Sequence, residues 1–106
     1  MDALVGQETR TASASMRIVW SSRALRDLIE IREYVALDKP RAAEKLAKKI
    51  ASSAERLTQH PHLGRRGREP EARELLIAGT PYILAYKFQT DRLAILTVLH
   101  GARKPT

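Results

Sequence analysis

Apolar residues recur with the period of an α-helix in two consecutive stretches between residues 23 and 57. In the first stretch they are Ala24, Leu28, Ile31 and Val35, and in the second Ala43, Leu46, Ala47, Ile50, Ala54 and Leu57. This spacing places apolar side chains on one face of each helix. Asp38-Lys39-Pro40 interrupts the pattern, and proline is tolerated in the first turn of a new helix. We therefore expect an antiparallel hairpin of two helices.

The segments on either side of this hairpin have the composition of β-strands. Residues 16–20 form a short apolar run, and Ser21 or Ser22 can then cap the first helix. Residues 73–78, 82–88 and 92–100 form three further runs with short turns between them, which favours antiparallel neighbours. The expected fold class is α+β: a single domain of order β-α-α-β-β-β, with the helical hairpin packed on a small, mainly antiparallel sheet. The strands are apolar on both faces, so we expect both faces to be covered, at least in part.

Two segments lack this periodicity. Residues 1–15 are polar and have neither the basic start nor the apolar middle of a signal peptide, so we expect a disordered leader or cloning remnant before a domain at 16–106. Residues 59–71 form a connection long enough to suggest a function. It contains Pro61, Gly64, Gly67, Pro70 and the arginines Arg65, Arg66 and Arg68. Guanidinium groups spaced by glycine suit phosphate contacts, and a flexible, solvated turn is the alternative.

Composition limits the functions that this chain can have. It has 106 residues, a formal net charge of +7 and no cysteine, so disulfides, thiolate catalysis and cysteine-based metal sites are excluded. The lack of cysteine suits the cytoplasm, which is the expected location. No run approaches the roughly 18 consecutive apolar residues of a membrane span. The positive charge suits a nucleic acid or an acidic protein as partner.

The histidines and tyrosines are weaker candidates for chemistry. His60 and His62 lack a third metal ligand nearby, so we expect no metal and no cofactor. His100 ends a strand, where it can act as a general base or simply bond the backbone. Tyr82 and Tyr86 share one strand face, where they can stack on bases or belong to the core.

Several motifs in series resemble the ParE/RelE superfamily of toxins from type II toxin–antitoxin systems, over the span from Arg17 to Arg103. They are Trp20-Ser-Ser-Arg-Ala24 followed by Asp27-Leu28, Pro40-Arg-Ala-Ala43, Leu57…His60-Pro61-His-Leu-Gly64-Arg65, Arg73-Glu74-Leu75, Pro81-Tyr82-Ile83…Tyr86, and Val98-Leu-His100-Gly-Ala-Arg103. The resemblance implies the same α+β fold.

The superfamily has two functional branches. RelE-like members cleave mRNA on the ribosome, and for such a nuclease the resemblance implies His100, Arg103 and Arg73 as catalytic residues. RelE itself has an arginine where this chain has Ile83, and a catalytic tyrosine beyond the position of Arg103, where no tyrosine follows here. The Gly-Arg-rich loop and the ending at His100 to Arg103 are closer to ParE-like members, which poison DNA gyrase without an assigned nuclease site. We expect a ParE-like toxin that acts by binding rather than as an enzyme.

The ParE-like interpretation implies two binding partners. DNA gyrase is the expected target, held in its cleaved complex with DNA, and the predicted contacts are Arg65, Arg66, Arg68, His100 and Arg103. A ParD-like antitoxin with an acidic, amphipathic segment is expected to wrap around the toxin in a hetero-oligomeric complex. Its predicted contacts are Leu25, Leu28, Ile29, Arg73, Tyr82 and Tyr86. The alternatives are the RelE-like nuclease and a nucleic-acid-binding module without toxicity.

Overall fold

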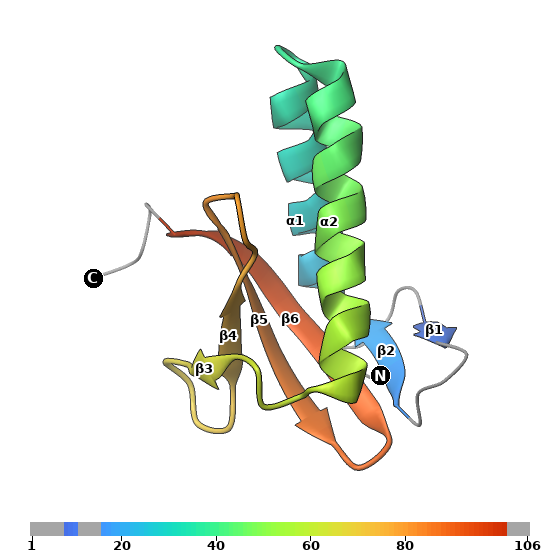
Figure 1. The fold of residues 1–106 in the computed structure, drawn as a ribbon, viewed down its shortest axis with the longest axis vertical. Helices are drawn as coiled ribbons and strands as arrows, with labels where there is room; N and C mark the ends of the chain where they lie inside the picture. The colour runs from blue at the N-terminus through green and yellow to red at the C-terminus, as the bar shows by residue number, and fades with distance from the viewer. Residues whose placement is uncertain (1–7, 11–15, 102–106) are drawn as a thin grey trace.

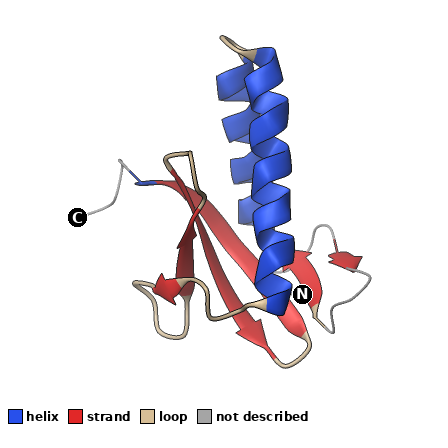
Figure 2. Cartoon of the chain, in the orientation of Figure 1, coloured by secondary structure: helices blue, strands red, loops and turns tan. Residues whose placement is uncertain are grey.

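The computed structural model describes residues 8–10 and 16–101. Its elements are β1 (Glu8–Arg10), β2 (Arg17–Trp20), α1 (Ser22–Ala36), α2 (Pro40–Gln59), β3 (Arg65–Arg66), β4 (Arg73–Leu76), β5 (Tyr82–Gln89) and β6 (Arg92–His100) (Figure 1). All six strands belong to one sheet, in the order β1-β2-β6-β5-β4-β3. β2 runs parallel to β6, and the other neighbouring pairs are antiparallel. Two helices lie side by side and rise beyond the sheet (Figure 2), so the predicted α+β architecture is confirmed.

The side chains of Ser21, the N-cap of α1, and of Asp27 in α1 bond the backbone of β6 beyond the end of β2. β2 pairs with β6 only as far as Ile95. Past that point, the Ser21 hydroxyl donates to the carbonyl oxygen of Leu96 at 2.8 Å, and it also accepts the N–H of Ala24 as the cap of α1. The Asp27 carboxylate accepts the N–H of Val98 at 3.0 Å. Both residues therefore satisfy strand groups that would otherwise lack a partner.

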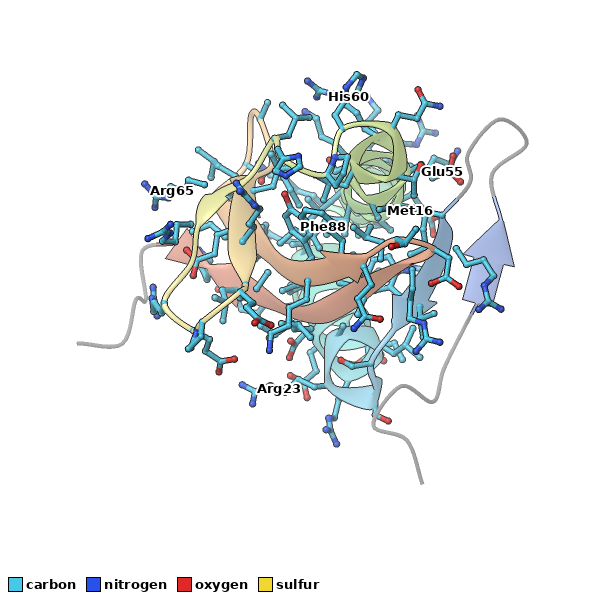
Figure 3. The ribbon with its side chains drawn as sticks, turned by 90° about the horizontal axis from the view of Figure 1, so that it is seen from below. Met16, Arg23, Glu55, His60, Arg65 and Phe88 are labelled. Atoms are coloured by element: carbon cyan, nitrogen blue, oxygen red, sulfur yellow. The ribbon has the colours of Figure 1, made fainter. Side chains whose placement is uncertain are left out.

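The core lies on both faces of the central strands. Every residue of β5 from Tyr82 to Tyr86 is buried. Seen from below in Figure 3, β5 and β6 run between α2 on one side and the first turns of α1 on the other. The main hydrophobic cluster joins apolar side chains of β2, β5 and β6 to the α2 residues Ile50, Ala54 and Leu57. The expectation that both sheet faces need cover is confirmed for this stretch.

The N-terminal segment contains one strand that the sequence analysis did not predict. Residues 1–7 and 11–15 of the expected leader lie outside the described residues. Residues 8–10, however, form β1, which pairs antiparallel with β2 through Thr9 opposite Ile18. A three-residue strand has too few positions to show a period of two, so the pattern of the sequence could not reveal it. Among residues 8–10 and 16–101, no helix is long and apolar enough to cross a membrane.

Candidate functional site: an anchored arginine loop

The candidate site is the connection between α2 and β4, residues 60–72, which we call the arginine loop. Within it, β3 pairs with β4 so that Arg65 lies opposite Glu74 and Arg66 opposite Arg73. Successive side chains of a strand point to opposite faces, so Arg65 and Arg66 point away from each other. Both are exposed, and Arg65 lies at the periphery of the molecule in Figure 3. Neither guanidinium has a hydrogen-bond or ion-pair partner in the part of the chain that the structure describes.

A buried tyrosine holds the start of the loop. Tyr86 is fully buried on β5, and its hydroxyl donates to the carbonyl oxygen of Pro61 at 2.6 Å. The same oxygen accepts the N–H of Gly64 at 2.9 Å. Burial raises the pKa of the Tyr86 hydroxyl above its usual 10.0, although the Gly64 N–H and the positive charge of Arg73 act in the opposite direction. The hydroxyl is therefore protonated and able to donate at neutral pH.

Gly64 fits this place because it has no side chain. Its carbonyl oxygen accepts a hydrogen bond from Nη1 of Arg73 at 2.7 Å. A Cβ at this position would lie 2.6 Å from the Tyr86 hydroxyl oxygen and 2.9 Å from the carbonyl oxygen of Glu74. Those distances are shorter than van der Waals contact, so any other residue would push the loop away from the sheet.

The far end of the loop is also closed. The N–H of Gly67 donates to the carbonyl oxygen of Ala72 at 2.8 Å. Arg68 Nε lies 3.9 Å from Oε2 of Glu74, whose side chain is only 10% exposed. The loop is thus fixed at both ends, and Arg65 and Arg66 are presented between the fixed points.

Arg68 brings this loop close to His100. Both residues line a hollow of about 340 Å³, together with Arg23, Asp27 and Glu30 of α1 and Tyr82 of β5. The His100 ring meets the Tyr82 ring edge to face, with centroids 5.2 Å apart. Two of the predicted target contacts, Arg68 and His100, therefore share one hollow, which is not lined by Arg65 or Arg66.

Two of the three predicted nuclease residues, Arg73 and His100, lie on different strands of the sheet. Arg73 is paired with Tyr86 and His100 with Tyr82, four positions apart on β5, and β5 lies between their two strands. Strand geometry puts their backbones about 16 Å apart, from a rise of ~3.3 Å per residue and a strand spacing of ~4.8 Å. The third residue, Arg103, lies outside the described residues.

The predicted antitoxin contacts divide between surface and core. Ile29 is 56% exposed, and Leu25 and Leu28 are partly buried against the core. Tyr82 and Tyr86 are 7% and 0% exposed, so both side chains belong to the core. The interpretation of these tyrosines as core residues is confirmed, and their contact with an antitoxin stays a prediction.

In the described residues, no three potential metal ligands lie close together, so neither His60 nor His62 belongs to a metal site there. His60 is the C-cap residue of α2, and the His62 ring packs edge to face on Phe88 at 5.1 Å. The sequence analysis missed the bonds of Tyr86 to the loop and of Asp27 to β6. Both join residues far apart in the sequence, and no local pattern marks such pairs.

Comparison with known proteins finds a matching family and two similar toxins. The family model for the ParE toxin of the parDE type II toxin–antitoxin system matches residues 18–105. Y4kP of Sinorhizobium fredii, provisionally named a toxin, is 43% identical over 85 residues, which are 80% of this chain and 88% of Y4kP. The toxin RelE2 of Caulobacter vibrioides is 33% identical over 87 residues, 82% of this chain and 97% of RelE2.

A solved structure gives the same picture for the fold. A chain from the chromosomal ParDE toxin–antitoxin system of P. aeruginosa aligns with a TM-score of 0.74 and 22% identity, over 81% of this chain and 96% of that chain. At this identity the likeness shows a shared fold. The match of the family model over most of the sequence shows more: the chain belongs to the ParE toxin family of type II toxin–antitoxin systems.

Proposed function

We propose that this toxin acts in the cytoplasm by binding DNA gyrase and stabilising its cleaved complex with DNA. The observation that carries the proposal is the arginine loop, which presents the exposed side chains of Arg65 and Arg66 from a backbone that is held at both ends. Guanidinium groups bind the carboxylates of a protein or the phosphates of cleaved DNA. A loop that is already ordered loses less entropy when it binds.

The separation of the nuclease residues also favours binding over cleavage. General acid–base chemistry needs its groups within hydrogen-bond reach of one reacting centre. Arg73 and His100 are about 16 Å apart by strand geometry, and Arg73 is occupied with the carbonyl oxygen of Gly64. This separation of their backbones gives no support for joint action of the two residues on one phosphodiester bond.

A ParD-like antitoxin is the proposed neutralising partner. The solved chain with the shared fold belongs to a ParDE toxin–antitoxin system. This chain carries a net charge of +7, and Ile29 exposes an apolar side chain beside Leu25 and Leu28 on α1. An acidic, amphipathic segment would complement both features. Its binding should raise the melting temperature of the toxin, because it would bind only the folded form.

The test is a gyrase cleavage assay with purified protein. Gyrase, ATP and plasmid are incubated with the chain, the protein is denatured and digested, and linear DNA is measured on a gel. We expect Arg65→Ala combined with Arg66→Ala to lower the linear product at least about tenfold, as expected for the loss of two charged contacts. The matched control is Arg41→Ala with Lys45→Ala, which removes the same charge from exposed positions on α2. Full activity of a folded loop variant would show that the loop does not bind the target.

A second candidate is a ribosome-dependent mRNA endonuclease of the RelE type. This candidate is supported by the relatives RelE2 and RelE3 of Caulobacter vibrioides, which are 33% and 34% identical to this chain. The test is cleavage of ribosome-bound mRNA, with His100→Ala as the inactive variant. Cleavage by the wild-type chain together with no effect on gyrase would replace the first proposal with this one.

A further inference from the structure

Tyr86 has a polar role that its place in the core does not require. Its ring is fully buried in the main cluster, where a phenylalanine ring would fill nearly the same space. Its hydroxyl nevertheless bonds two backbone groups of the arginine loop, the carbonyl oxygen of Pro61 and the N–H of Gly64. These groups lie 25 and 22 residues earlier in the chain. A side chain of the core thus forms hydrogen bonds directly with the backbone of the loop.

Gly64 is held at both of its backbone polar groups by side chains of the sheet. Tyr86 of β5 accepts its N–H, and Arg73 of β4 donates to its carbonyl oxygen. Gly64 is buried, and the next residue is the exposed Arg65. One peptide bond therefore separates a fixed backbone position from the first exposed arginine of the loop.

We propose that Tyr86 and Arg73 are positioning residues for Arg65 and Arg66, an inference that rests on the proposed role of the arginine loop. They hold the backbone from which these guanidinium groups reach the target, and they do so without touching the target. Without the hydroxyl, the Gly64 N–H and the Pro61 carbonyl oxygen would both lose their partner. Buried backbone groups seldom stay unpaired, so this part of the loop would move to meet water. The arginines would then bind from a less ordered backbone.

The variant that tests this role is Tyr86→Phe, with Tyr82→Phe as its matched control. Tyr82 lies on the same strand and the same face and is also buried, but its hydroxyl bonds no loop residue that the structure describes. A second control is Ile50→Val, which trims the core at a fully buried position of α2. It lowers stability without removing a bond to the loop.

The first readout is gyrase cleavage at a temperature where every variant is folded. We expect Tyr86→Phe to be at least about tenfold weaker than wild type, and both controls to stay within about twofold. The second readout is exchange of the Gly64 amide hydrogen by NMR. We expect exchange at least about tenfold faster in Tyr86→Phe only, because the other variants keep its acceptor.

The outcomes separate this inference from the proposed function. If Arg65→Ala with Arg66→Ala loses activity while Tyr86→Phe keeps it, the positioning role is refuted and the loop remains the binding site. The positioning role is also refuted if Ile50→Val weakens cleavage as much as Tyr86→Phe, since a general loss of stability then explains both. If the double arginine variant keeps full activity, the proposed function of the loop fails first.

Should Tyr86→Phe not fold, Arg73→Met tests the same role from the other side of Gly64. Arg73 lies on the half-exposed strand β4, and we expect the same loss of cleavage.

Discussion

The two ends of α2 are connected to the rest of the molecule in different ways. At its C-terminal end, α2 leads into the arginine loop, where Tyr86 and Arg73 bond the backbone of Gly64. At its N-terminal end, residues 37–39 join it to α1 through backbone hydrogen bonds within the turn. There, Leu37 is 86% exposed and Tyr34 70% exposed. The side chains that link the helices near this turn, Arg32 and Glu44, are also exposed.

This difference shows that the length of a connection does not determine its order. The longer connection receives hydrogen bonds from buried or half-buried side chains of the sheet, whereas the short one depends on local backbone bonds. Buried hydrogen bonds are costly to break, and exposed ion pairs contribute little. Changes at the loop end should therefore cost far more stability than changes at the hairpin end.

The largest effect is expected for Gly64→Ala. Its Cβ would lie 2.6 Å from the Tyr86 hydroxyl oxygen, so either the loop or β5 must move. We expect a loss of about 3 kcal/mol in the free energy of unfolding, as for other overpacked sites. Lys39→Ala at the hairpin end should change it by less than about 0.5 kcal/mol, since Lys39 makes no side-chain cap bond. Urea denaturation measures both, and similar losses for the two variants would contradict the comparison.

An intermediate effect is expected for Tyr86→Phe, and it should depend on pH. Below about pH 10 the variant should lose about 1–2 kcal/mol, because it leaves buried backbone groups without a partner. Burial raises the pKa of this hydroxyl in the folded state, so the unfolded chain releases the proton first as pH rises. The stabilisation by Tyr86 is therefore complete below the unfolded pKa and lost as pH rises through the folded pKa.

Urea denaturation between pH 8 and pH 11 measures this dependence. Above about pH 10 the advantage of the wild type over Tyr86→Phe should shrink by up to ~1.4 kcal/mol per pH unit. Tyr34→Phe at the exposed hairpin end is the control, and it should follow the wild-type curve. A constant difference between wild type and Tyr86→Phe across this range would argue against the buried hydroxyl as its origin.

The smallest effect is expected for the ion pair at the hairpin end. Arg32 Nη2 lies 2.5 Å from Glu44 Oε2, but the two side chains are 54% and 58% exposed. Arg32→Ala should therefore cost less than about 1 kcal/mol. High salt should reduce this difference further, because it screens exposed charges. A larger, salt-independent loss would show that the hairpin end is held as firmly as the loop end.

Much of the fold follows from local patterns, but the site depends on register. Helical spacing placed both helices, and the prediction of Ser21 or Ser22 as the cap marked the start of α1, because capping is a local interaction; the structure shows that Ser21 is the cap. The prolines, glycines and arginines of residues 59–71 likewise marked the loop. The pairing of β3 with β4 decides that Arg65 and Arg66 point to opposite faces, and sequence alone did not give that pairing. The pairing on β5 separates Arg73 from His100, two residues that the resemblance had grouped.

β1 has a consequence for how copies of this protein meet. The longest strands, β5 and β6, lie inside the sheet, and its outermost strands are β1 and β3, with three and two residues. A long outer strand would offer a row of free N–H and carbonyl groups on which another chain could add a strand. Because β1 covers β2 along residues 17–19, most of that edge is already paired. In a concentrated solution of this toxin, the sheets of two molecules should therefore seldom pair along this edge.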